Sequence, residues 1–223
     1  MFGGRSPAEP RRGPLFTRRK SFPAYAVTMT ASTPKSSEES ILASARQEIE
    51  RAGILGLRVA DVATGADSSI TQIYRHFDNR DGLLARVLGD MYDEFTTNAV
   101  STYLSRIEGL DPLTVDDLVA ALPLQFTPQS MKVQELRLQI LAASITNEPL
   151  RLRLEKCTQN LVTMWNEGLD GIESRMAPGE TFDRRVFIMM LALQNPYYRA
   201  LFGEHSFTED EYRQFLRDKM RGN

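Results

Sequence analysis

The spacing of apolar residues constrains this chain more than any other feature. From Ile41 to Met220 they recur at intervals of three and four residues, which keeps them on one face of a helix. No run alternates apolar and polar residues as a half-buried strand does, and the Asp170-Gly171 pair lies inside a helical pattern. No internal repeat at solenoid spacing is found. The sequence therefore predicts an all-α fold, with three short helices followed by longer ones.

Residues with capping preferences mark the ends of these helices. Hydroxyls at Ser36 and Ser37 precede two glutamates and start the first helix, and Gly53 ends it. Asn79 caps a long fourth helix, which stops before the Gly-Leu-Asp-Pro sequence at 109–112. The other helices are expected at 58–66, 68–77, 115–124, 130–146, 149–176, 182–201 and 209–220.

Composition limits the class of protein. The 223 residues are 42% apolar and 25% charged, as in globular proteins. No stretch approaches the roughly eighteen consecutive apolar residues of a membrane span, so a soluble protein is expected. The single cysteine, Cys157, excludes an internal disulfide framework and paired thiolate metal ligands, which favours the cytoplasm. Neither a metal nor a cofactor is predicted.

Positive charge is concentrated at the start of the chain. Residues 1–36 hold seven Lys or Arg against one acid, a net charge of +6, whereas the remainder holds 20 basic and 28 acidic residues, a net charge of -8. Pro, Gly and Arg are frequent there, so a disordered extension is expected, with Met29 as a second candidate start. The arginines are not followed by the apolar core of an export signal. A basic arm suits contact with a polyanion, although a solvated tail is the commoner meaning of such a run.

The segment "SSITQIYRHF" at 68–77 predicts a helix with two different faces. At about 100° per residue, one arc is apolar and is expected to pack on the first two helices. That arc holds Ile70, Ile73, Tyr74 and Phe77. The opposite face holds Ser68, Thr71, Gln72 and Arg75, flanked by Ser69 and His76. These groups hydrogen-bond phosphate oxygens or base edges, and no acid lies among them; a short polar surface helix is the alternative.

The neighbouring segments place this helix in a helix-turn-helix. A short helix, a tight turn and a second helix with an exposed N-terminus form that motif, and its second helix enters the major groove of DNA. Arg58 begins the preceding helix and Arg80 begins the following one, where phosphates would pass. The pattern thus favours a nucleic-acid interface.

These residues resemble the DNA-binding domain of the tetracycline-repressor (TetR) family of bacterial regulators. "ILASARQEIERAG" and "LRVADVATGADSSITQIYRHFDNRDGLL" carry the resemblance, which covers about 37–88. Its most specific part is "YRHF" at 74–77, followed by Arg80 and a Leu-Leu pair. The rest of the chain is similar only in length and helical order. The resemblance implies a DNA-binding domain at 37–82 and a helical ligand-binding and dimerisation domain at 83–223, after the basic extension at 1–36.

The resemblance also implies which residues meet DNA. Tyr74, His76 and Arg58 match positions that contact the DNA backbone, and Arg80 matches a basic residue that holds a phosphate. The positions that face the groove are Ser69, Ile70, Thr71 and Gln72.

The chain departs from the family pattern in three places, one of which is Ile70, which stands where a polar residue is frequent and suits contact with a thymine methyl. Asp67 and Ser68 replace the usual Gly-Val of the turn, and Asp tolerates the left-handed backbone conformation better than most residues. Arg46 and Glu48 replace apolar residues that are common in the first helix.

The C-terminal half is expected to form a homodimer. The family pairs its two penultimate long helices between subunits, and the segments 149–176 and 182–201 are the matching candidates. Two recognition helices then meet successive major grooves about 34 Å apart. The predicted interface residues are Leu161, Gly168, Ile172, Val186, Met189, Met190, Leu193 and Tyr197. The alternative is that these residues form the core of a single subunit.

An effector site is expected among the later helices. The region shows no charge constellation for a metal or a phosphorylated ligand, so an uncharged or amphipathic organic effector is expected. The resemblance implies that such an effector favours a splayed dimer and releases DNA by shifting the conformational population. Candidate lining residues are Tyr92, Phe95, Leu122, Phe126, Leu138, Leu141, Met164 and Trp165. Ordinary core packing is the alternative for each of them.

An enzyme is the rival class, and the sequence does not favour it. His76 is accounted for by the helix-turn-helix, and His205 has no spaced partner. No nucleophile elbow, glycine-rich phosphate loop or HExxH pair is present. The second rival is a helical small-molecule binder whose helix-turn-helix no longer binds DNA, because residues 37–80 hold five basic and seven acidic residues. A ligand-responsive repressor is the leading prediction.

Overall fold

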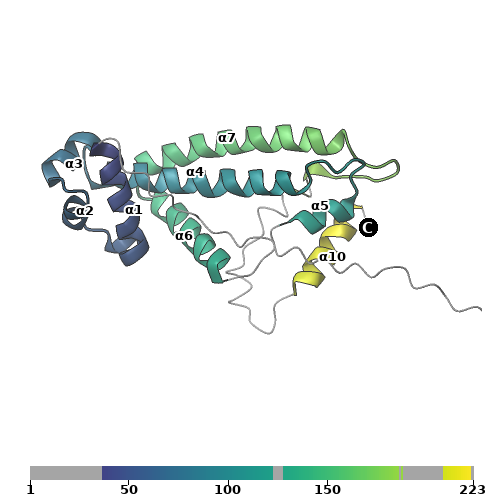
Figure 1. The fold of residues 1–223 in the computed structure, drawn as a ribbon, viewed down its shortest axis with the longest axis horizontal. Helices are drawn as coiled ribbons and strands as arrows, with labels where there is room; N and C mark the ends of the chain where they lie inside the picture. Colours follow the sequence, from purple (N-terminus) through teal and green to yellow (C-terminus); the bar gives the residue numbers. More distant parts are fainter. Residues whose placement is uncertain (1–36, 123–127, 186, 188–207, 222–223) are drawn as a thin grey trace, which may run out of the picture. The chain divides into compact units, whose positions relative to one another are not determined.

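The computed structural model describes residues 37–122, 128–185, 187 and 208–221, all within one compact unit that spans 31–223. Within these residues every regular element is a helix, and Leu113 and Met176 form only an isolated β-bridge. The fold is therefore all-α, as predicted. The helices are α1 Ser37–Gly56, α2 Val59–Gly65, α3 Ile70–Phe77, α4 Arg80–Arg106, α5 Val115–Ala121, α6 Pro128–Ser144, α7 Glu148–Glu173 and α10 Glu209–Met220 (Figure 1).

Side-chain caps fix several of these boundaries. The Asn79 side chain accepts a hydrogen bond from the Gly82 N–H at 2.9 Å and so begins α4, as the sequence predicts. Thr114 and Thr208 form capping boxes that begin α5 and α10. Gly53 has a φ of 75° and interrupts α1, after which the helix resumes to Gly56, so the predicted stop is a kink. The helix predicted at 182–201 lies mostly outside the described residues.

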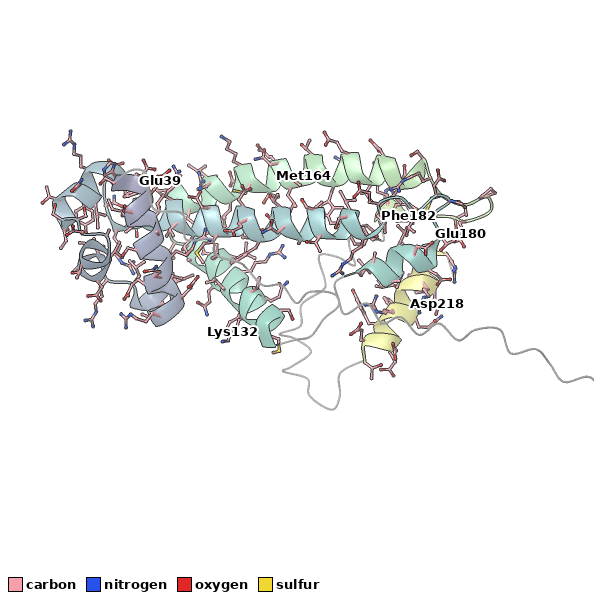
Figure 2. All side chains as sticks on the ribbon, in the orientation of Figure 1. Glu39, Lys132, Met164, Glu180, Phe182 and Asp218 are labelled. Atoms are coloured by element: carbon pink, nitrogen blue, oxygen red, sulfur yellow. The ribbon has the colours of Figure 1, made fainter. Side chains whose placement is uncertain are left out.

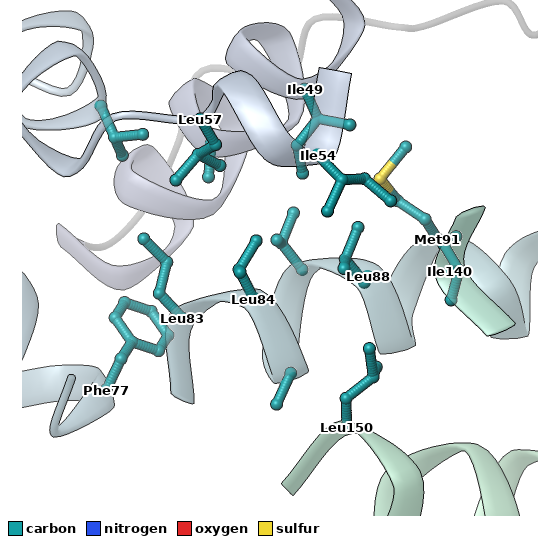
Figure 3. Close-up of a cluster of buried hydrophobic side chains, with 14 of the residues drawn as sticks. Ile49, Ile54, Leu57, Phe77, Leu83, Leu84, Leu88, Met91, Ile140 and Leu150 are labelled. Carbon is teal, nitrogen blue, oxygen red and sulfur yellow. The ribbon is translucent and has the colours of Figure 1, made fainter. Parts of the chain in front are cut away.

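Helices α1, α2 and α3 pack together, and α1 and α3 also pack against the N-terminal part of α4 (Figure 1). Figure 3 shows Ile49, Ile54 and Leu57 facing Leu83, Leu84 and Leu88 of α4 in a buried cluster. Ile73 and Phe77 anchor α3 in this cluster. Ile70 and Tyr74 are 43% and 39% exposed, so the buried arc of α3 is narrower than predicted.

The contact between α1 and α2 depends on two small residues. Ser44 is buried on α1 and donates a hydrogen bond from Oγ to the Val62 carbonyl of α2 at 2.9 Å. A Cβ at Gly65 would lie 2.4 Å from the Ser44 Oγ, closer than any tolerable contact. The backbone of α2 therefore lies directly on α1, which sets the position of the turn that follows.

The two polar residues that depart from the family pattern in α1 both have partners. Arg46 pairs with Glu94 of α4, with 2.6 Å between Nη1 and Oε2. Glu48 is buried and accepts two hydrogen bonds from Arg51, at 2.9 Å and 2.5 Å. Paired in this way, the charged groups are compatible with a helix that packs on its neighbours.

Helices α4 and α7 lie side by side, and α6 packs against both (Figure 1). Gly89 permits the close approach, since a Cβ there would lie 2.2 Å from the Arg153 Cδ. Leu150, Leu154 and Cys157 of α7 face α4 in the same core as the helix-turn-helix. This continuous core joins α1–α3 to α7.

A second apolar cluster joins the far ends of α4 and α7 to α5 and α10. Its aromatic residues are in ring contact, with centroids 5.4 Å apart for Tyr103 and Phe187 and 5.7 Å apart for Tyr103 and Trp165. Burial raises the pKa of Tyr103, whose hydroxyl donates to the Leu118 carbonyl at 3.2 Å. The described chain thus holds two cores, one at each end of α4.

Candidate nucleic-acid interface

The turn between α2 and α3 has the backbone that the sequence predicts. Asp67 adopts a φ of 49°, in the left-handed region that Asp tolerates. Ser69 then caps α3, because its Oγ accepts a hydrogen bond from the Gln72 N–H at 3.1 Å. Together these residues reverse the chain and present the first turn of α3 on the surface.

The exposed face of α3 is hollowed and polar. The hollow is lined by Ser69, Thr71, Gln72, Arg75 and His76. All five are exposed and none is acidic. Hydroxyls, an amide, a guanidinium and an imidazole therefore face outward together. We call these five residues the α3 face.

The other predicted DNA contacts on α3 lie beside this face. Ile70 and Tyr74 are exposed, and so an apolar side chain and a phenol border the polar groups. The His76 ring lies against the ring of Phe77, with 6.0 Å between centroids. The structure thus brings Ser69, Ile70, Thr71, Gln72, Tyr74 and His76 onto one exposed surface.

The acids near α3 stand at its two ends. Asp67 precedes the helix and Asp78 follows it with a φ of 63°. Both are exposed. Helix α3 itself, from Ile70 to Phe77, carries no carboxylate. Any repulsion between a carboxylate and a DNA phosphate is therefore confined to the two ends of the helix.

Arg80 is held by the protein backbone. Its Nη2 donates to the Leu57 carbonyl at 3.3 Å and to the Ile54 carbonyl at 3.5 Å. These oxygens belong to the end of α1 and the connection to α2, so Arg80 fastens that connection to α4. The phosphate contact predicted for Arg80 stays a prediction.

Arg75 is the residue that the predicted site set omitted. It is exposed on the α3 face, and no hydrogen bond or ion pair engages its side chain among the described residues. Arg46 and Arg51 are paired with carboxylates, whereas Arg58 is exposed at the N-cap of α2. The sequence signal for Arg75 was its place opposite the apolar arc of α3.

The predicted effector-site residues are divided between the two cores. Tyr92 is buried and Phe95 is partly buried in the first cluster, whereas Leu122 and Trp165 belong to the second. Leu138 and Met164 are partly exposed, with Met164 on α7 (Figure 2), and Leu141 is exposed. Phe126 lies outside the described residues. The seven described residues are therefore divided between the two clusters and partly or fully exposed positions.

The predicted dimer residues on α7 make contacts within the chain. Ile172 is fully buried in the second cluster, so this residue belongs to the core of its own chain. Gly168 faces Leu104, whose nearest atoms would lie 2.9 Å from an added Cβ. Leu161 is partly exposed. The remaining five, Val186, Met189, Met190, Leu193 and Tyr197, lie outside the described residues.

The described residues lack both membrane-spanning helices and grouped metal ligands. None of these helices is both long and apolar enough to cross a membrane. Over the same ranges, no three His, Cys, Asp or Glu side chains are grouped as metal ligands.

Comparison with known proteins agrees with the geometry of the helix-turn-helix. Residues 41–87 match the family model for bacterial regulatory proteins of the tetR family. This segment runs from α1 into α4 and contains the whole α3 face. The chain has no match among curated proteins.

Solved structures share the fold along most of the chain. Salmonella enterica GusR has a TM-score of 0.57 and 18% identity, and the match covers 86% of this chain and 97% of GusR. A protein of Rhodococcus sp. assigned to the TetR-family transcriptional regulators has a TM-score of 0.55 and 21% identity, covering 83% of this chain and 98% of its own. One from Mesorhizobium loti MAFF303099, assigned likewise, has a TM-score of 0.55 and 15% identity, covering 86% and 96%. Residues 41–87 therefore match the N-terminal domain of the tetR family of bacterial regulatory proteins, and the described helices share the fold of these solved structures.

Proposed function

We propose that this protein is a ligand-responsive transcriptional repressor that binds a near-palindromic DNA operator as a homodimer. The α3 face carries the proposal, because it presents five exposed polar side chains without an acid on the second helix of a helix-turn-helix. In this proposal residues 37–82 bind DNA, residues 83–223 bind the effector and the second subunit, and the protein acts in the cytoplasm.

Several residues on and beside the α3 face have a task in this proposal. The Gln72 amide matches the two hydrogen-bonding atoms of an adenine edge, and the exposed Ile70 offers contact to a thymine methyl. Arg75 and Arg58 supply charge to phosphates or to guanine. Tyr74 and His76 contact the DNA backbone at the side of the groove.

Placement compensates for the modest charge of this domain. Residues 37–80 hold five basic and seven acidic residues, yet Arg58 and Arg75 are exposed, and one of the acids, Glu48, is paired with Arg51. The basic extension at 1–36, with its net charge of +6, adds a second source of phosphate affinity in the proposal.

A twofold homodimer is part of the proposal because a near-palindromic operator requires two recognition helices. Leu152 and Val162 support a role for α7, since each is an apolar side chain that is 53% exposed in the single chain. An apolar surface on a long helix is a common element of subunit contacts.

The effector in this proposal is an uncharged or amphipathic organic molecule. Met164 and Trp165 support a site near α7, because both are partly exposed neighbours on that helix. Trp165 also packs on the aromatic rings of the second cluster. Binding there would lower DNA affinity only if the effector prefers a conformation in which the two α3 helices no longer fit the operator.

A helical small-molecule binder without DNA contact is the second candidate. Asp67 and Asp78, exposed at the ends of α3, are the observation that favours it. An enzyme is less well supported, because the polar side chains of the α3 face lie on a helix-turn-helix.

A genomic-fragment selection with the purified protein distinguishes these candidates. A near-palindromic motif that binds two chains, and binds less tightly as salt rises, would support the repressor. Counting chains per fragment by light scattering tests the dimer in the same sample. A helical dimer that enriches no fragment would contradict the proposal and favour the small-molecule binder.

A further inference from the structure

The side-chain amide of Gln72 is held at both of its ends. Its Nε2 donates a hydrogen bond to the Ser37 Oγ at 2.8 Å, although Ser37 is 35 residues earlier in the sequence. Its Oε1 accepts a hydrogen bond from the Ser68 Oγ at 3.2 Å. A glutamine side chain on a helix surface ordinarily samples several rotamers, so two partners restrict it strongly.

These bonds leave the amide able to bind a base. A glutamine amide has two N–H donors, and its oxygen has two acceptor sites. Ser37 occupies one donor and Ser68 occupies one acceptor site. One donor and one acceptor remain, and these are the two atoms that a bidentate contact with adenine needs.

Ser37 is itself fixed by its surroundings. It begins α1, and the next residue, Glu38, pairs with Arg86 of α4 at 3.5 Å. Arg86 also donates to Asp90 at 3.0 Å, and Ile41, one turn along α1, is fully buried. The hydroxyl that accepts from Gln72 therefore stands on a helix anchored to the core.

We propose that Ser37 is a positioning residue that holds the Gln72 amide in one orientation for base reading, with Ser68 as the second holder. The inference rests on the proposed function, because it assigns Ser37 to the α3 face as a determinant of sequence preference. Without the Ser37 hydroxyl, the Gln72 amide can turn and place its N–H donors where its oxygen stood. The side chain then forms hydrogen bonds with more than one type of base.

The test compares base preference across a set of operators that differ at single base pairs. Gln72→Ala should lower the preference at its base pair by about 5- to 150-fold. Ser37→Ala should lower the preference at the same base pair by about three- to tenfold, the effect of one hydrogen bond. The double variant should show no further loss beyond Gln72→Ala.

Two control variants separate positioning from damage to the fold. Ser37→Thr keeps a hydroxyl and should retain the preference of the unmodified protein. Ser105→Ala removes an exposed hydroxyl on α4, away from α3, and should change nothing. Ser37→Ala should also keep the salt slope, because the hydroxyl carries no charge.

Each outcome has a defined meaning. If Gln72→Ala changes base preference while Ser37→Ala does not, or if Ser37→Ala weakens all operators equally, the positioning role is overturned and the proposed function stands. Tighter binding by Ser37→Ala at unchanged preference also overturns it, since the bond would then compete with DNA. If the unmodified protein prefers no operator, both the proposed function and this inference fail.

Discussion

Gly82 is the position where a single methyl group should disturb the helix-turn-helix most directly. A Cβ on Gly82 would lie 2.0 Å from the carbonyl oxygen of Phe77 and 3.1 Å from its carbon. Cβ atoms essentially never approach another heavy atom closer than 3.0 Å, so the two backbones must separate by about 1 Å. Phe77 ends α3, and Gly82 lies in the first turn of α4. Gly82→Ala therefore pushes the end of α3 away from the first turn of α4.

Gly171 provides the matched control for this substitution. It also lies inside a helix, α7, but nothing stands within 4 Å of its added Cβ. Gly171→Ala should raise the free energy of unfolding by about 0.5–1 kcal/mol, the usual helix preference of Ala over Gly. Gly82→Ala gains the same preference and loses about 1–3 kcal/mol to the forced separation.

Urea unfolding followed by circular dichroism measures the difference between these two variants. We expect Gly82→Ala to be less stable than Gly171→Ala by about 1–3 kcal/mol, and to bind all DNA sequences more weakly. If the two variants unfold at the same urea concentration, Gly82 does not lie against the Phe77 carbonyl as closely as described.

Three more substitutions test the described contacts by the same unfolding assay. Ile73→Ala empties a fully buried position of α3 and should cost about 2–5 kcal/mol, whereas a loss below 1 kcal/mol would contradict that burial. Asn147→Ala removes the cap of α7, which accepts from the Leu150 N–H at 2.9 Å, and should cost about 1 kcal/mol. The hydrogen bonds from Arg51 hold the pKa of Glu48 below its ordinary value, so they stabilise the fold above that ordinary pKa, and this stabilisation is lost as pH falls through the lowered pKa. Glu48→Gln should flatten this acid loss of stability, and an unchanged pH profile would refute the assignment.

The fold was readable from the sequence where the signals are local. Asn79 caps α4 as predicted, because the preference of Asn for that position depends on the next three residues alone. Asp67 adopts the left-handed conformation for a similarly local reason. The α3 face was predicted from helical periodicity, which fixes the side of a helix that each residue occupies.

Contacts between residues far apart in the sequence could not be predicted from such local signals. The partner of Arg46 is Glu94, 48 residues away, and Gln72 meets Ser37 across 35 residues. Helical spacing marks Ile70 and Ile73 as equally apolar, but only docking on α1 and α4 decides that Ile73 alone is buried. Likewise, the apolar stripe of α7 has the same pattern whether it faces α4 or a second subunit, and Ile172 faces the interior of its own chain.

The central claim is that the α3 face binds DNA, and Arg75 offers its most direct test. Binding of the selected fragment is measured against salt for the unmodified protein, for Arg75→Ala and for Arg185→Ala, which removes the same charge from an exposed position outside α3. If α3 binds DNA, Arg75→Ala should weaken binding and lower the slope of log affinity against log salt by about 1, whereas Arg185→Ala should leave both unchanged. Equal effects of the two substitutions would mean that only overall charge matters, which would contradict binding through α3.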